Sequence, residues 1–168
     1  IEFEGDYSNP LKYAHNLCFN DELVVSLIIP EGVTKIASCA FKYCTSLTSI
    51  TLPKSLRKIG KEAFKVYNIH ISDIGAWCGI KFDVEDSDKE SCNYYDHPLR
   101  YAKKLYLNNE LVTNLVIPEG VTEIATNAFY GCKSLTSITL PKSLRKIGNR
   151  AFEGCKNLKE IEFPNSLK

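Results

Sequence analysis

Short segments in which apolar and polar residues alternate recur along this chain. Ile50-Thr51-Leu52 and Ile138-Thr139-Leu140 each place one polar residue between two apolar ones, and proline follows both segments. Alternation with a period of two predicts a half-buried β-strand. Proline has no N–H to donate, so the strand is expected to end there. The pattern therefore predicts short strands that each lead into a turn.

The predicted strands return with a fixed period. Ile29-Pro30 and Leu52-Pro53 lie 23 residues apart, as do Ile117-Pro118, Leu140-Pro141 and Phe163-Pro164 in succession. A single repeat of this length cannot bury its apolar side, whereas stacked repeats share a continuous core. We therefore expect an elongated solenoid in which equivalent leucines, isoleucines and phenylalanines lie above one another.

A longer period contains the shorter one. The run SLTSITLPKSLRKIG occurs at Ser46–Gly60 and again, 88 positions later, at Ser134–Gly148. Such self-similarity outranks local signals when a fold is predicted. We expect 1–168 to be a single solenoid segment of two 88-residue super-repeats. The first is truncated at its start, and both chain ends fall mid-pattern, as in an excerpt from a longer array.

The first super-repeat also contains a segment that breaks the 23-residue rhythm. Asp73 is a favourable N-cap, and Ile74, Trp77 and Cys78 follow at helical spacing, which predicts a short amphipathic helix with the only tryptophan. Pro98 and its equivalent Pro10 mark further helix starts. An insertion of nine residues in the stretch 83–97 predicts an exposed loop, whose role the sequence leaves open.

Asparagine-rich pairs predict two tight turns. Asn20-Asp21 and Asn108-Asn109 each lie between apolar pairs, and asparagine and aspartate tolerate the positive φ that two-residue hairpin turns require. Cys44, Cys132 and Cys155 occupy one repeat position, so we expect a buried column of free thiols. Disulfides are not excluded by this pattern, and the redox state of the seven cysteines stays open.

Composition narrows the classes of function. A net charge of +1 and a pI near 7.7 give no global field that would attract nucleic acid or a membrane surface. No apolar stretch is long enough to span a bilayer. Zinc-ligand spacings, glycine-rich phosphate loops and nucleophile motifs are absent from the sequence. We expect no metal, no cofactor and no enzymatic activity, in a monomer; a Cys78–His70 pair in one repeat is the weak alternative.

The predicted sheet supplies the first candidate binding surface. Residues that flank each buried isoleucine should point outward, and curved solenoids commonly bind extended partners on their sheet. The outward positions that we expect to contact a ligand are Ser49, Thr51, Asn68, His70, Asn114, Val116, Ser137, Thr139, Glu160 and Glu162. These residues are mostly small and polar, so we expect a broad contact of modest strength.

Basic residues form the second candidate surface. They occupy equivalent places in equivalent repeats, so stacking should bring them to one face: Lys54, Arg57, Lys58, Lys142, Arg145 and Lys146. A solvated face is the simple interpretation. The alternative is a patch for acidic glycans or protein carboxylates, with an affinity that falls as salt rises. The sequence leaves open which of the two faces binds.

The stretch Ile117 to Pro141, which reads IPEGVTEIATNAFYGCKSLTSITLP, closely resembles the BspA-like leucine-rich repeat family. This resemblance implies an α/β-class, right-handed leucine-rich repeat solenoid, or horseshoe, with short parallel strands on the concave face and short helices and turns on the convex side. It implies a cell-surface or secreted protein that binds host matrix proteins or glycans in adhesion. The family brings no catalytic residues. The alternative is a structural spacer array with no ligand of its own.

Overall fold

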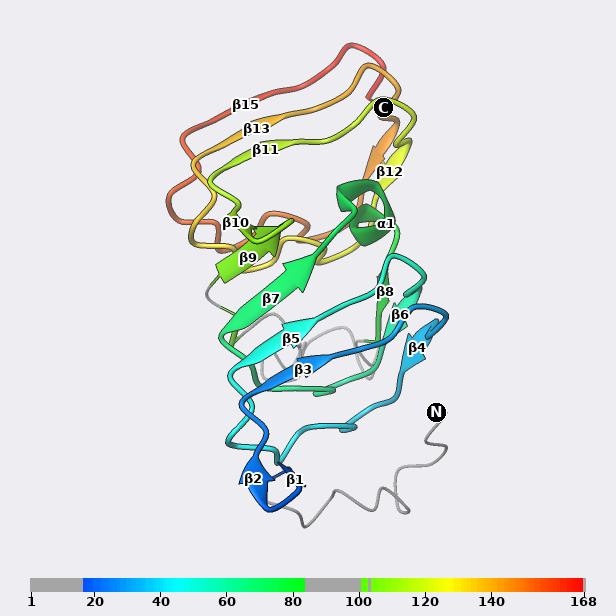
Figure 1. The fold of residues 1–168 in the computed structure, drawn as a ribbon. Coiled ribbons are helices and arrows are strands. Elements are labelled where there is room, and N and C mark those ends of the chain that lie inside the picture. Colours follow the sequence, from blue (N-terminus) through cyan, green and yellow to red (C-terminus); the bar gives the residue numbers. More distant parts are fainter. Residues whose placement is uncertain (1–16, 84–100, 103, 168) are drawn as a thin grey trace, which may run out of the picture.

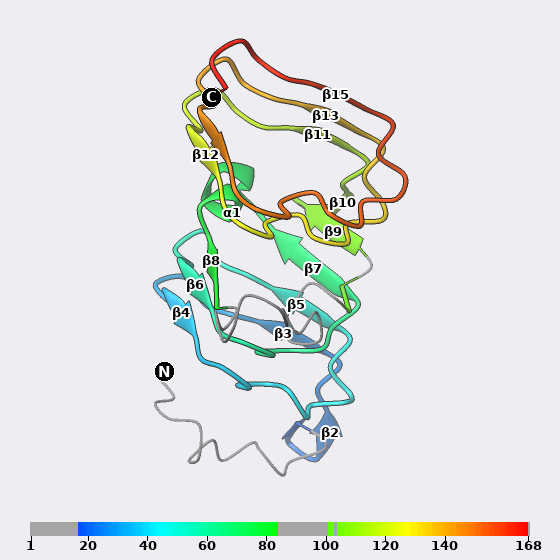
Figure 2. The ribbon, with the colours of Figure 1, turned by 180° about the vertical axis from the view of Figure 1, so that it is seen from behind.

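The computed structural model describes residues 17–83, 101–102 and 104–167. The chain winds into an elongated stack in which successive repeats lie one above another (Figures 1 and 2). Equivalent strands follow each other along one side of the stack. The predicted leucine-rich repeat solenoid with parallel strands is therefore confirmed, and it is built mainly from short strands and turns.

Two sheets run along the main side of the stack. The first has the order β10-β9-β7-β5-β3 and the second β11-β13-β15, and every neighbouring pair is parallel except β9 with β10. The strands of the first sheet are β3 (Ser26–Ile28), β5 (Ser49–Thr51), β7 (Asn68–Ile71), β9 (Lys104–Leu107) and β10 (Glu110–Leu111). Those of the second are β11 (Asn114–Val116), β13 (Ser137–Thr139) and β15 (Glu160–Glu162).

A second set of two-residue strands lies on the other side of each coil. These strands pair in parallel, as β4-β6-β8 in the first super-repeat and β12-β14 in the second. Their bounds are β4 (Lys35–Ile36), β6 (Lys58–Ile59), β8 (Lys81–Phe82), β12 (Glu123–Ile124) and β14 (Lys146–Ile147). In the described residues, the side of each coil opposite the main sheets thus consists of turns and short strands. It has one helix, whereas the family resemblance led us to expect several.

That helix is α1 (Ile74–Cys78), and the sequence predicted it correctly. Asp73 is the N-cap, with its carboxylate accepting a hydrogen bond from the Ala76 amide at 2.9 Å. Ile74, Trp77 and Cys78 face the core and are buried. The expected helix starts at Pro10 and Pro98, and the loop 83–97 except for Asp83, lie outside the described residues.

Both predicted two-residue turns are present. Asn20 and Asp21 join β1 (Cys18–Phe19) to β2 (Glu22–Leu23), and Asn108 and Asn109 join β9 to β10. All four turn residues have φ between 50° and 68°, the left-handed region that asparagine and aspartate tolerate. The two hairpins are equivalent, 88 positions apart.

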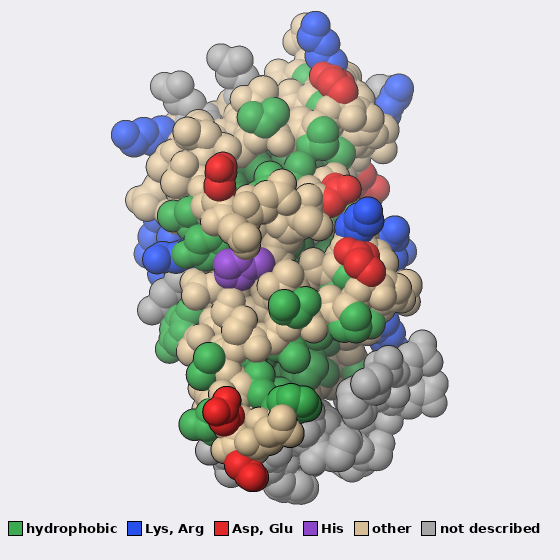
Figure 3. Space-filling model, viewed as in Figure 1, with side chains coloured by type: hydrophobic (Ala, Val, Ile, Leu, Met, Phe, Trp, Pro, Cys, Tyr) green, Lys and Arg blue, Asp and Glu red, His purple; other side chains and the backbone are tan. Residues whose placement is uncertain are grey.

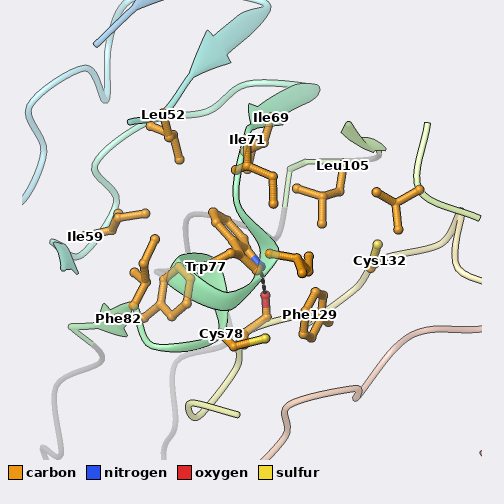
Figure 4. Packing of buried hydrophobic residues seen from close by; sticks show 14 of the residues in the cluster. Leu52, Ile59, Ile69, Ile71, Trp77, Cys78, Phe82, Leu105, Phe129 and Cys132 are labelled. Atoms are coloured by element: carbon orange, nitrogen blue, oxygen red, sulfur yellow. Dashed lines mark hydrogen bonds between the residues drawn. The ribbon is translucent and has the colours of Figure 1, made fainter. Parts of the chain in front are cut away.

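Leucine, isoleucine, phenylalanine and cysteine form one apolar core through the stack. Trp77 packs edge-on against Phe82, with ring centroids 5.8 Å apart, and lies among Ile71, Cys78 and Phe129 (Figure 4). The expected burial of the repeated thiols is confirmed: Cys44, Cys132 and Cys155 are buried and form no disulfide, and Cys78 is buried as well, whereas Cys18 is exposed.

Polar side chains tie each turn to the preceding repeat. The hydroxyl groups of Ser55, Ser143 and Ser166 donate to backbone carbonyl oxygens 22 positions earlier, at 2.8–3.0 Å. At Gly60 and Gly148 an added Cβ would lie within 2.3 Å of a backbone nitrogen of the preceding repeat, which only glycine permits. The repeat spacing therefore fixes both the hydrogen bonds and the closest backbone contacts.

Candidate functional site

The first sheet presents a continuous outward surface, which we call the outer strip. Parallel pairing in register places Ile28, Thr51, His70 and Tyr106 in one row. The neighbouring row contains Ser26, Ser49, Asn68 and Lys104, and the residues between the rows point into the core. The outer strip therefore brings together four of the predicted binding residues: Ser49, Thr51, Asn68 and His70.

An aromatic pair that the sequence analysis missed lies in the outer strip. The rings of His70 and Tyr106 stack with centroids 4.5 Å apart and an angle of 6° between their planes. Tyr106 belongs to β9, which pairs with β7 through four residue pairs. The signal for this strand was the apolar alternation Leu105-x-Leu107 just before the Asn108-Asn109 turn.

Apolar residues extend the His70–Tyr106 pair on both sides. Ile28, at the start of the same row, is 72 % exposed. Leu111 pairs with Tyr106 across the β9–β10 hairpin and is 39 % exposed. Hydrophobic and uncharged polar side chains cover much of this face, Asp and Glu are scattered over it, and most Lys and Arg lie at its margins (Figure 3).

The remaining predicted sheet residues belong to the second sheet. Asn114 and Val116 are on β11, Ser137 and Thr139 on β13, and Glu160 and Glu162 are positions of β15. The Asn114 side-chain oxygen accepts hydrogen bonds from Thr136 and Ser137 at 3.1 and 2.8 Å, so its outward polar group is already engaged. The ten predicted residues are thus divided between two sheets.

The predicted basic face is interleaved with acidic groups. Lys58 forms an ion pair with Asp83 at 2.8 Å, and Lys146 forms one with Glu123 at 2.7 Å. Glu31 and Glu119 accept from the backbone amides of Lys54 and Lys142, so a carboxylate lies beside each of these turns. The guanidinium group of Arg57 donates to the carbonyl oxygens of Lys54 and Leu56. Arg145 is at the position equivalent to Arg57.

One row of lysines differs between the super-repeats. Lys35, Lys58 and Lys81 lie in register on β4, β6 and β8. The equivalent row of the second super-repeat pairs Glu123 with Lys146. Adjacent strands are about 4.8 Å apart, so the first super-repeat brings three lysines together, of which Lys58 is paired with Asp83, whereas the second pairs Glu123 with Lys146.

The structure argues against the Cys78–His70 catalytic pair. His70 stacks on Tyr106 in the outer strip, whereas Cys78 is 0 % exposed in the core. Burial, together with the nearby charge of Asp73, raises the pKa of the Cys78 thiol to about 12, so the nucleophilic thiolate is strongly disfavoured. Among the described residues no group of three or more histidines, cysteines or carboxylates is arranged to hold a metal ion. Within the same part of the chain no helix is both long and apolar enough to cross a bilayer.

The sequence of this chain matches a known family of repeat proteins. The model of the BspA type leucine rich repeat region matches six copies, over residues 12–78 and 102–168. No curated protein matches the chain.

Solved leucine-rich repeat proteins align with most of the chain. A leucine rich cell surface protein of Faecalibacterium prausnitzii A2-165 is 25 % identical over 84 % of this chain and 42 % of its own length, with a TM-score of 0.47. The T. pallidum leucine rich repeat protein is 26 % identical over 86 % and 50 % of the two chains, with a TM-score of 0.33. This chain thus spans half or less of the length of these two proteins. Because the matched repeats take in most of its residues, the chain belongs to the BspA-type leucine-rich repeat family.

Proposed function

We propose that this chain is a non-enzymatic protein-binding module of the cell surface or the secreted space, which uses the outer strip in adhesion to host matrix proteins. The observation that carries the proposal is the His70–Tyr106 stack in the outer strip, between the exposed apolar residues Ile28 and Leu111. Family membership supports a binding role, and the similar Faecalibacterium protein is a leucine rich cell surface protein, which supports the location.

The chemistry of the outer strip suits a protein partner. Aromatic side chains contribute large contact areas at low conformational cost, and tyrosine is enriched among residues that dominate binding energy. The stacked rings hold each other in place before a partner arrives, which lowers the entropy lost on binding. Small hydroxyl side chains at Ser49 and Thr51 leave the adjoining surface accessible to an extended backbone.

Binding of the purified chain to a panel of immobilised extracellular matrix proteins tests this proposal. Surface plasmon resonance should detect at least one partner, and the double substitution H70A/Y106A should weaken that binding at least about tenfold. The matched control is S137A/T139A on the second sheet, which should change the affinity less than about twofold. Unchanged affinity of the H70A/Y106A variant would contradict the role of the outer strip. Absence of binding to every matrix protein would favour the spacer function.

A sulfated glycan is a second candidate ligand, which the in-register row Lys35, Lys58 and Lys81 favours. Heparin is the probe. Charge reversal at Lys35 and Lys81 should lower retention on a heparin column, and raised salt should have the same effect. The triple substitution K142E/R145E/K146E tests the predicted basic face of the second super-repeat in the same assay. Equal retention of all variants would exclude the glycan.

A further inference from the structure

Two buried cysteines lie in adjacent layers of the second super-repeat. Cys132 and Cys155 are 23 positions apart in the sequence, and each is 8 % exposed. The Cys155 thiol donates to the carbonyl oxygen of Phe129 at 3.1 Å, across the boundary between the layers. The backbone of Cys132 forms a hydrogen bond with the same sulfur. The Cys155 side chain therefore points at the turn that carries Cys132.

Backbone pairing just before the two cysteines sets their register. The Phe129 amide donates to the Ala151 carbonyl at 2.8 Å, and the Gly131 amide donates to the Glu153 carbonyl at 2.7 Å. A Cβ on Gly154 would lie 3.3 Å from the Gly131 Cα, so the two backbones approach closely at the preceding position. The next residue in each layer is a cysteine, and the two cysteines are therefore opposite each other.

This register suits a disulfide. Residues in register on adjacent parallel segments are about 4.8 Å apart, and the Cα atoms of bridged cysteines are usually roughly 4.4–6.8 Å apart. The rings of Phe129 and Phe152, three positions before the cysteines, stack with centroids 5.3 Å apart and planes 3° apart. Closure then requires rotation of the two cysteine side chains between layers that the stacked rings already hold together.

The first super-repeat has no such pair. Cys44 corresponds to Cys132, 88 positions later. Phe41 bridges in parallel to Phe64 of the next layer, but β5 begins eight positions after Phe41, whereas β7 begins four positions after Phe64. The shorter connection leaves no cysteine opposite Cys44 among the described residues. Only the second super-repeat, within that part of the chain, therefore places two thiols in register.

We propose that Cys132 and Cys155 are an oxidisable pair, which a small disulfide such as oxidised glutathione converts into a stabilising cross-link between adjacent layers. One protein thiolate attacks a sulfur of the small disulfide and releases a small thiol, which leaves a mixed disulfide. The second protein thiolate attacks the protein sulfur of that intermediate and releases the other small thiol. The two protein sulfurs lose two electrons, the small disulfide gains them, and the two thiol protons go to the released thiolates.

Burial makes this exchange slow and its product durable. Burial, together with the neighbouring Cys132, raises the pKa of the Cys155 thiol to about 12, and burial also raises the pKa of Cys132. The reacting thiolates are therefore scarce at neutral pH, and reaction goes through local opening of the layers. Once closed, the cross-link is shielded from reductants by the same packing. Its formation does not depend on which ligand the outer strip binds.

Oxidation of the folded full chain tests the proposal. The Cys18→Ser variant removes the exposed thiol, and it is incubated with oxidised glutathione at pH 8 before free thiols are blocked. Trypsin separates the two cysteines into the peptides 105–133 and 151–156. Mass spectrometry should find these two peptides joined, with the loss of two hydrogens. The oxidised chain should also have a urea midpoint about 1 M above that of the reduced chain, because the cross-link restricts the unfolded state.

Matched serine variants complete the test. In the same Cys18→Ser background, Cys132→Ser should abolish both the joined peptides and the gain in urea midpoint, whereas Cys44→Ser should leave both unchanged. Absence of the joined peptides, a mixed disulfide that persists on Cys132 or Cys155, or predominant pairing with another cysteine would each overturn the proposal. So would an oxidised chain that carries the cross-link and has the urea midpoint of the reduced chain.

Discussion

The first repeat and its equivalent 88 positions later have almost the same sequence and different surroundings. Phe129 is 1 % exposed and stacks on Phe152, with ring centroids 5.3 Å apart, whereas its counterpart Phe41 is half-buried. Ile117 is buried and Ile29 half-buried. In the second super-repeat α1 lies on this layer: the Trp77 indole donates to the Ala128 carbonyl oxygen, and the Ala125 amide donates to the Cys78 carbonyl oxygen. Burial in a solenoid is thus conferred by the neighbouring layer and is no property of a repeat alone.

Truncating Trp77 should have the largest effect on this difference in burial between the two layers. Trp77→Ala should lower the free energy of unfolding by about 3–5 kcal/mol, because it leaves a large cavity in the core beside Phe82 and Ala128. It also leaves the Ala128 carbonyl without the indole N–H. Urea denaturation followed by circular dichroism measures the effect. Trp77→Phe, which keeps most of the ring volume, is the control and should cost clearly less; equal costs would mean that the indole does not seal this layer.

Truncating the matched phenylalanines should sharpen the comparison. Phe129→Ala should lower the free energy of unfolding by about 3–5 kcal/mol, because it leaves a cavity in the core. Phe41→Ala should cost about half as much, because its ring already has contact with water in the native state. Urea denaturation measures the loss of unfolding free energy in both variants, and the ratio of these two losses is the informative quantity. A ratio near one would show that the two layers are equally well packed.

Exposed and buried cysteines should differ in reactivity, and the buried ones should make a smaller, pH-dependent contribution to stability. Cys18 on the open hairpin is exposed, whereas burial raises the pKa of the Cys78 and Cys155 thiols from 9.0 to about 12. The folded thiols stay protonated where the unfolded chain ionises, so stability should hold below pH 9 and fall between pH 9 and about 12. At pH 8 a thiol-specific reagent should label Cys18 at once and Cys78 roughly 100-fold more slowly.

Peptide mapping by mass spectrometry identifies the labelled cysteines, with Cys18→Ser as the control that removes the fast phase. Labelling of Cys78 as fast as that of Cys18 in the folded chain would contradict its burial. Such a result would also reopen the Cys78–His70 interpretation that the structure argues against.

Local sequence rules predicted the elements well where the signal lies within one repeat. The strands before Pro53 and Pro141, the helix capped by Asp73 and the turn at Asn108-Asn109 follow from alternation, capping and backbone preference. The strand at 104–107 was missed, because two alternating leucines before a turn are a weak signal. Its pairing with β7 depends on residues more than 30 positions away in sequence.

The candidate site shows the same limit. Outward positions on each strand could be read from the period of two, so Thr51 and His70 were identified. The sequence could not show that Tyr106 stacks on His70, because the register between β7 and β9 is set across a segment without repeat character. Nor could it show that Glu123 and Asp83 neutralise predicted basic residues, since those ion pairs join different layers of the stack.

The amino-acid sequence by itself determined the repeat length, the strand positions, the tryptophan helix and the family, because each depends on spacing along the chain. Tertiary structure alone decided where one sheet ends and the next begins, which aromatic rings meet in the outer strip, and which copy of an identical apolar surface is covered. The physical reason is that contacts between layers depend on what lies above and below a repeat, and identical repeats here have different neighbours.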